Sequence, residues 1–102
     1  MMRLALAALM ALLTAAPATA ADPFHREDLR IPMAAAGPRG LEAILIRPSG
    51  AQRYPLALLS HGAPRDGAVR GGMTPNGLYA QAFEFARRGF AAVVVMRRGY
   101  GN

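Results

Sequence analysis

The chain has 102 residues, a formal net charge of +6 at pH 7 and no cysteine. This length allows one small domain, and the absence of cysteine excludes disulfide bonds, thiolate metal sites and cysteine nucleophiles. All basic residues are arginines, scattered without interleaved aromatic residues, so the charge does not predict a nucleic-acid partner. Gly71-Gly72 lacks the following Lys-Ser or Lys-Thr of a phosphate-binding loop, and no metal-ligand cluster occurs. We therefore expect no cofactor and no bound metal.

The first 20 residues have the composition of a cleaved leader. Arg3 supplies a short positive segment, residues 4–13 are all apolar, and Ala18-Thr19-Ala20 presents small residues to a signal peptidase. The apolar run is shorter than the roughly 20 residues of a membrane-spanning helix, and Pro17 follows it closely. We therefore predict cleavage of residues 1–20, export to the periplasm or the exterior, and no stable membrane anchor.

The mature chain is predicted to begin with a polar segment and two short strands. Residues 21–28 are mostly polar, and we expect a loose arm there. Residues 29–33 alternate apolar and polar side chains with Pro32 inside the run, which favours an edge strand. A turn at 37–40 leads to a second run, 41–47, rich in isoleucine and leucine. Because the connection is too short for a parallel crossover, the two runs predict an antiparallel pair.

Two apolar runs flank a helical segment in the second half of the chain. Residues 54–60 form the first strongly apolar strand, and residues 90–96 form the next, with β-branched residues at its centre. Parallel strands that are covered on both faces lose their polar alternation, so this arrangement predicts a parallel βαβ unit. The glycine-rich residues 62–72 predict a connection that is long for a βα loop and is therefore a candidate functional loop.

The helix of this unit is predicted to start at Thr74-Pro75 and to end at Gly89. Thr74 is a suitable N-cap, Pro75 suits the first helical position, and Gly89 can adopt the left-handed closing conformation. Glu84 and Arg88 lie on the polar face with the spacing of an ion pair. The apolar face is formed by Leu78, Ala82, Phe85 and Ala86. The expected fold class is α/β: an antiparallel pair, then a parallel βαβ unit, at the start of a larger sheet.

Residues 41–102 contain four short sequence motifs, and their order along the chain indicates a protein family. They are a Leu-x-x-x-Leu-x-Arg-Pro-Ser-Gly lead-in, an apolar strand ending in Ser60-His61-Gly62, an Ala-Arg-Arg-Gly-Phe helix exit, and Arg98-Gly99-Tyr100-Gly101 after the next strand. This set resembles the start of an α/β-hydrolase of the dienelactone-hydrolase or serine esterase and peptidase kind. The resemblance implies that residues 29–102 are the N-terminal portion of a hydrolase domain. The complete enzyme would hydrolyse a small-molecule ester or lactone, or a peptide, through a serine nucleophile.

The loop after the first apolar strand carries the main candidate residues. In such hydrolases the His-Gly loop builds the oxyanion hole, whose backbone N–H groups face the negative oxygen of a tetrahedral intermediate. The resemblance assigns this loop to His61, Gly62 and Ala63, with the donor on Gly62 or Ala63, because Pro64 has no N–H. Adjacent strand residues point to opposite faces, so Ser60 and His61 are not expected to act as nucleophile and base. We expect the His61 ring to hold the loop by hydrogen bonds.

Arginines follow the last predicted strand, at the edge where open parallel sheets bind ligands. Arg98, next to Arg97, is a candidate for contacting an anionic group of the substrate, and Tyr100 is a candidate at the same edge. The alternative interpretation is that Arg98 and residues 99–101 form a hydrogen-bonded structural corner.

The sequence does not contain a complete catalytic set. An α/β-hydrolase places its nucleophile in a Gly-x-Ser-x-Gly elbow, followed by an acid and a histidine. Ser49 and Ser60 both lack this glycine pattern, and Asp66 is expected to be a turn residue. We therefore expect an inactive N-terminal fragment of an exported hydrolase. The alternatives are a small exported binding module and a truncated gene product without function.

Overall fold

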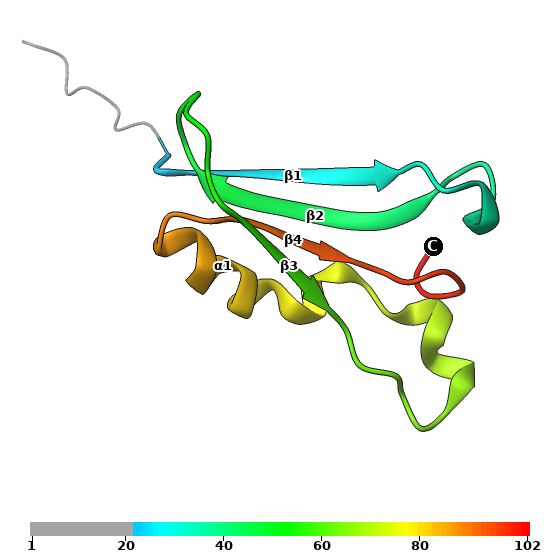
Figure 1. The fold of residues 1–102 in the computed structure, drawn as a ribbon. Helices are drawn as coiled ribbons and strands as arrows, with labels where there is room; N and C mark the ends of the chain where they lie inside the picture. Colours follow the sequence, from blue (N-terminus) through cyan, green and yellow to red (C-terminus); the bar gives the residue numbers. More distant parts are fainter. Residues whose placement is uncertain (1–21) are drawn as a thin grey trace, which may run out of the picture.

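The computed structural model describes residues 22–102, which form one mixed sheet with helical segments (Figure 1). The expected leader, residues 1–20, lies outside the described residues. The strands are β1 (Phe24–Ile31), β2 (Leu41–Pro48), β3 (Leu56–Ser60) and β4 (Ala91–Val95). The helical elements are the α-helix α1 (Tyr79–Arg87) and the short 3-10 helices η1 (Ala34–Ala36), η2 (Gly67–Gly72) and η3 (Pro75–Leu78). None of the helices in residues 22–102 has the length and apolar character needed to cross a membrane.

The order of strands across the sheet is β1-β2-β4-β3, so the last strand in the chain is inserted between β2 and β3 (Figure 1). Strand β2 is antiparallel to both β1 and β4, whereas β3 and β4 run parallel and are connected through α1. The expected antiparallel pair and parallel βαβ unit are therefore confirmed as an α/β arrangement. Ser60 is paired with Val95, which brings the carboxyl ends of β3 and β4 to the same edge.

Strand β1 begins earlier than the sequence predicts. Residues 24–28 were expected to lie in a loose arm, but they belong to β1 and continue the pairing with β2 as far as Phe24 and Pro48. Two contacts hold this part of β1 against the helical layer. The ring of Phe24 meets the ring of Phe83 edge-on at 4.8 Å, and Arg26 donates a hydrogen bond of 2.8 Å to the side-chain oxygen of Asn76.

The core lies between α1 and one face of the sheet. Its buried residues are Ile44 and Ile46 of β2, Ala92 and Val94 of β4, Met96 directly after β4, and Ala82 and Ala86 of α1. Small residues on the helix allow its backbone to come close to the β-branched side chains of the strands. The burial of these side chains between α1 and the sheet therefore contributes hydrophobic free energy to folding.

The opposite face of the sheet is covered by no α-helix among the described residues. Strand 54–60 was expected to be buried on both faces, but Leu56 and Leu58 are 66% and 62% exposed. The side chains of β3 alternate between exposed and half-buried, because only the face toward α1 is covered. The regular structure of this strand also starts two residues later than predicted, at Leu56.

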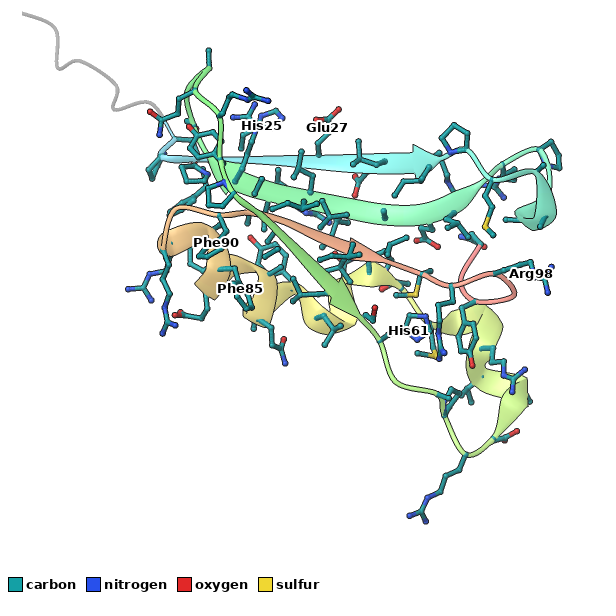
Figure 2. All side chains as sticks on the ribbon, in the orientation of Figure 1. His25, Glu27, His61, Phe85, Phe90 and Arg98 are labelled. Atoms are coloured by element: carbon teal, nitrogen blue, oxygen red, sulfur yellow. The ribbon has the colours of Figure 1, made fainter. Side chains whose placement is uncertain are left out.

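Helix α1 starts differently from the prediction and ends as predicted. The side chain of Thr74 makes no capping hydrogen bond, and the 3-10 helix η3 precedes the α-helix, which starts at Tyr79. At the other end Gly89 has a φ angle of +92°. The N–H of Gly89 donates to the carbonyl of Ala86 and that of Phe90 to the carbonyl of Phe85, which is the Schellman closure. The rings of Phe85 and Phe90 then meet edge-on at 5.6 Å (Figure 2).

Candidate functional site

The carboxyl ends of β3 and β4 bring two loops together that are far apart in the sequence. Strand β3 ends at Ser60 and is followed directly by His61, Gly62 and Ala63, while β4 is followed by the turn that contains Tyr100. Figure 2 shows His61 just beyond the end of β3, beside this turn. The candidates from the first loop and Tyr100 from the second therefore lie at one edge of the sheet.

The imidazole of His61 bridges the two loops through both ring nitrogens. Its side chain is largely buried, with 9% exposed. Nε2 lies 3.0 Å from the backbone nitrogen of Arg97, which can only donate, so Nε2 is the acceptor and carries no proton. Nδ1 lies 2.7 Å from the carbonyl oxygen of Gly62 and therefore donates its hydrogen. The hydrogen bonds that we expected from this ring are present, and they define a neutral imidazole protonated on Nδ1.

The hydrogen bond from His61 also orients the next peptide group. The carbonyl of Gly62 and the N–H of Ala63 belong to one peptide, and the described residues contain no cis peptide bond. In a trans peptide the two groups point in opposite directions. Because the carbonyl of Gly62 points to His61, the N–H of Ala63 points away from the ring. Within residues 22–102 neither this N–H nor that of Gly62 donates a hydrogen bond.

The ring of Tyr100 packs beside the ring of His61. The centroids of the two rings are 4.5 Å apart. The guanidinium groups of Arg70 and Arg97 lie 5.4 Å and 5.1 Å from the centre of the Tyr100 ring, at distances typical of cation–π contacts. Tyr100 was predicted as a residue of the substrate edge, and the structure gives it contacts that hold the loop after β3 to the loop after β4.

The turn after β4 is a hydrogen-bonded corner, as in the alternative interpretation of this segment. The N–H of Tyr100 donates to the carbonyl of Arg97, and the N–H of Gly101 donates to the carbonyl of Arg70 at 2.9 Å. Gly101 has a φ angle of +68°, and a Cβ at this position would lie 2.5 Å from a carboxylate oxygen of Glu42. The backbone conformation therefore favours a glycine at this position, whereas the Glu42 carboxylate is the flexible end of a side chain and could move aside.

Arg98, the other substrate-edge candidate, is exposed and makes no hydrogen bond or ion pair among the described residues. Figure 2 shows its side chain extending away from the sheet and from His61. It borders a shallow hollow of about 230 Å³, which is also lined by Leu41 and Tyr100 but not by Gly62. The structure thus brings Tyr100 to the candidate loop and leaves Arg98 apart from it.

The long connection between β3 and α1 is more regular than its composition predicts. Residues 67–72 form η2, and the side chain of Asp66 accepts the N–H of Ala68 at 2.9 Å at its start. The interpretation of Asp66 as a turn residue is confirmed. Ser60 is exposed whereas His61 is buried, and both nitrogens of His61 are occupied by backbone groups. The described residues therefore contain no activated nucleophile at this edge, and they contain no cluster of three potential metal ligands.

Comparisons of the chain with protein-family models, with curated proteins and with solved structures found no match. Within the described residues, the distinctive features of this edge are the His61 ring, which is held by two hydrogen bonds, and the N–H groups of Gly62 and Ala63, which donate no hydrogen bond.

Proposed function

We propose that this chain is the N-terminal portion of an exported serine hydrolase of the α/β-hydrolase type, acting on ester, lactone or related acyl bonds. In these enzymes one N–H of the oxyanion hole comes from the loop between the third strand and the first helix. Here the loop between β3 and α1 contains His61, Gly62 and Ala63. The arrangement of an antiparallel pair followed by a parallel βαβ unit supports the same proposal.

The observation that carries the proposal is the orientation of the peptide between Gly62 and Ala63. The hydrogen bond from His61 to the carbonyl of Gly62 directs the N–H of Ala63 away from the imidazole, without a partner in the described residues. A preorganised N–H of this kind stabilises the negative charge that develops on a carbonyl oxygen during acyl transfer. We assign the donor role to Ala63 and the role of positioning residue to His61.

Gly62 contributes free space beside this donor. A Cβ placed at Gly62 would meet no atom of the chain within 4 Å, and its φ angle is not in the left-handed region. A side chain at position 62 would therefore leave the loop unstrained and would occupy the volume into which a substrate carbonyl must move. Pro64 has no N–H, so it cannot extend the set of donors.

A chimera tests this proposal. Residues 22–102 replace the corresponding segment of an active dienelactone-hydrolase-like esterase, which supplies the nucleophile elbow, the acid and the histidine. We expect the chimera to hydrolyse p-nitrophenyl acetate and Gly62→Val to lower kcat/KM by about 10²-fold, the effect of losing one oxyanion donor. Gly71→Val is the matched control, because a Cβ at Gly71 also meets no atom within 4 Å. A folded chimera without turnover, or equal rates for the two variants, contradicts the proposal.

A further inference from the structure

The helical layer contains an asparagine that is followed by a glycine, Asn76-Gly77, in the short helix η3. Both residues are exposed. The side-chain amide of an asparagine can be attacked by the main-chain nitrogen of the next residue, because this attack closes a succinimide ring. Glycine hinders the attack least, because it has no Cβ. A Cβ placed at Gly77 would meet no atom of the chain within 4 Å, so this peptide is also open to water.

Arg26 of β1 holds the amide of Asn76 at its oxygen. Nη2 of Arg26 donates to Oδ1 of Asn76 at 2.8 Å, and because a guanidinium can only donate, this atom is the carbonyl oxygen. Negative charge develops on the same oxygen when the ring closes, and a cationic donor at this distance stabilises it, as the donors of an oxyanion hole do. Arg26 is a long, exposed side chain, so its guanidinium can follow Oδ1 when the amide turns toward Gly77.

The attacking nitrogen of Gly77 is held by one long hydrogen bond. Its N–H donates to the carbonyl of Thr74 at 3.2 Å, at the upper end of the usual range. Helix η3 has four residues, and the side chain of Thr74 makes no capping hydrogen bond at its start. Short 3-10 helices have poorer hydrogen-bond geometry than α-helices, so this turn opens locally at a small cost and frees the nitrogen.

We propose that Asn76 is a site of spontaneous deamidation that Arg26 promotes. The nitrogen of Gly77 bonds to Cγ of Asn76, the bond from Cγ to Nδ2 breaks, and ammonia leaves with the proton that the Gly77 nitrogen gives up. Water then opens the succinimide at either of its two carbonyl carbons, which gives aspartate or isoaspartate at position 76. Water is the only co-reactant.

The place of Asn76 in the fold makes this inference independent of the proposed hydrolase function. Asn76 contacts β1, which lies at the edge of the sheet opposite β3. Under the proposed function the sheet continues beyond β3, and strands added there would leave the contact between Arg26 and Asn76 as it is.

The two products differ in how they fit the fold. Aspartate keeps acceptor oxygens opposite Arg26, so the hydrogen bond becomes an ion pair. Isoaspartate adds a methylene group to the main chain between Pro75, which is buried, and Leu78, which packs against the core. We therefore expect the isoaspartate product to loosen the start of α1, whereas the aspartate product retains the fold.

Incubation of the purified chain near neutral pH, followed by tryptic peptide mapping and mass spectrometry, tests the proposal. Cleavage after Arg70 and Arg87 releases residues 71–87 as one peptide, and fragmentation distinguishes a change at Asn76 from one at Gln81. We expect both aspartate and isoaspartate to accumulate at position 76, because direct hydrolysis of the amide would give aspartate alone. Gly77→Ala should slow the reaction by about tenfold or more, because its methyl group hinders ring closure.

A pair of arginine variants tests the role of the β1 side chain. Arg26→Leu should slow deamidation by about tenfold, part of the effect that one oxyanion donor has in an enzyme. Arg30→Leu is the matched control, because Arg30 lines the same hollow as Asn76 but makes no hydrogen bond to it. Circular dichroism verifies that the variants are folded. An unchanged Asn76 in the wild type, aspartate without isoaspartate, or a rate in Arg26→Leu that equals or exceeds the rate in Arg30→Leu overturns the proposal.

Discussion

His61 connects more of the candidate site than any neighbouring residue in the loop after β3. One imidazole accepts the N–H of Arg97, donates to the carbonyl of Gly62 and contacts the ring of Tyr100. The ring can accept from Arg97 only while Nε2 is unprotonated. The orientation of the Ala63 N–H therefore depends on the position and the tautomer of a single side chain.

Replacing His61 by alanine should loosen the loop that follows β3. The substitution removes the acceptor for the Arg97 N–H and the donor for the Gly62 carbonyl, a loss of about 1–2 kcal/mol in local stability. Tryptic cleavage after Arg65, in the same loop, should then become roughly tenfold faster. His25→Ala is the control, because His25 is exposed and, among residues 22–102, the polar partner of its ring is the carboxylate of Glu27, at 3.4 Å. Equal cleavage rates in the two variants would show that His61 does not hold the loop.

The sequence was sufficient to predict the residues of the candidate site that are adjacent in the chain. It was insufficient to predict the contact with Tyr100, which is distant in the chain. His61, Gly62 and Ala63 are consecutive, and Pro64 limits the donors by its chemistry alone, so the candidate loop could be predicted. The packing of Tyr100 against His61 could not be predicted, because it depends on the close pairing of β3 with β4 and on the turn that Gly101 closes. The sequence therefore predicted Tyr100 as a residue of the substrate edge but did not predict its contact with His61.

The strands and the helix show the same contrast: elements marked by a local sequence pattern could be predicted, and an element that depends on tertiary pairing could not. Strands β2 and β4 and the end of α1 are specified by apolar runs and by Gly89, and they were predicted within one or two residues. The start of β1 was missed, because residues 25–28 are polar and have no alternating pattern. They form a strand through backbone pairing with β2, and such tertiary pairing overrides weak local propensity.

The alanines on the inner face of α1 determine how closely the helix approaches the sheet. Ala82 has no exposed surface, whereas Ala80 is exposed on the other side of the same helix. Ala82→Leu should lower the free energy of unfolding by about 1–3 kcal/mol, because the larger side chain does not fit beneath the helix. Ala80→Leu should change it by less than about 0.5 kcal/mol. Urea unfolding followed by circular dichroism measures both. Equal effects would mean that α1 does not pack on the sheet as described.

At the scale of the whole molecule, the described residues form an asymmetric layer. One face of the sheet carries α1 and the core, and the other face and the β3 edge are open. The carboxyl edge holds the N–H of Ala63, which donates no hydrogen bond among the described residues, and its serine, Ser60, is exposed. Under the proposed function, the described residues would stabilise the transition state of acyl transfer but would not supply the nucleophile that starts it.

The chain by itself should therefore have no esterase activity. Acyl transfer requires a nucleophile and a general base within hydrogen-bond reach, but Ser60 is exposed and both nitrogens of the buried His61 are bound to backbone groups. Purified chain with a folded circular dichroism spectrum should hydrolyse p-nitrophenyl acetate no faster than Ser60→Ala. Turnover that disappears in Ser60→Ala would identify Ser60 as a nucleophile. It would also require His61 to release the Arg97 N–H during catalysis, which contradicts its assignment as a positioning residue.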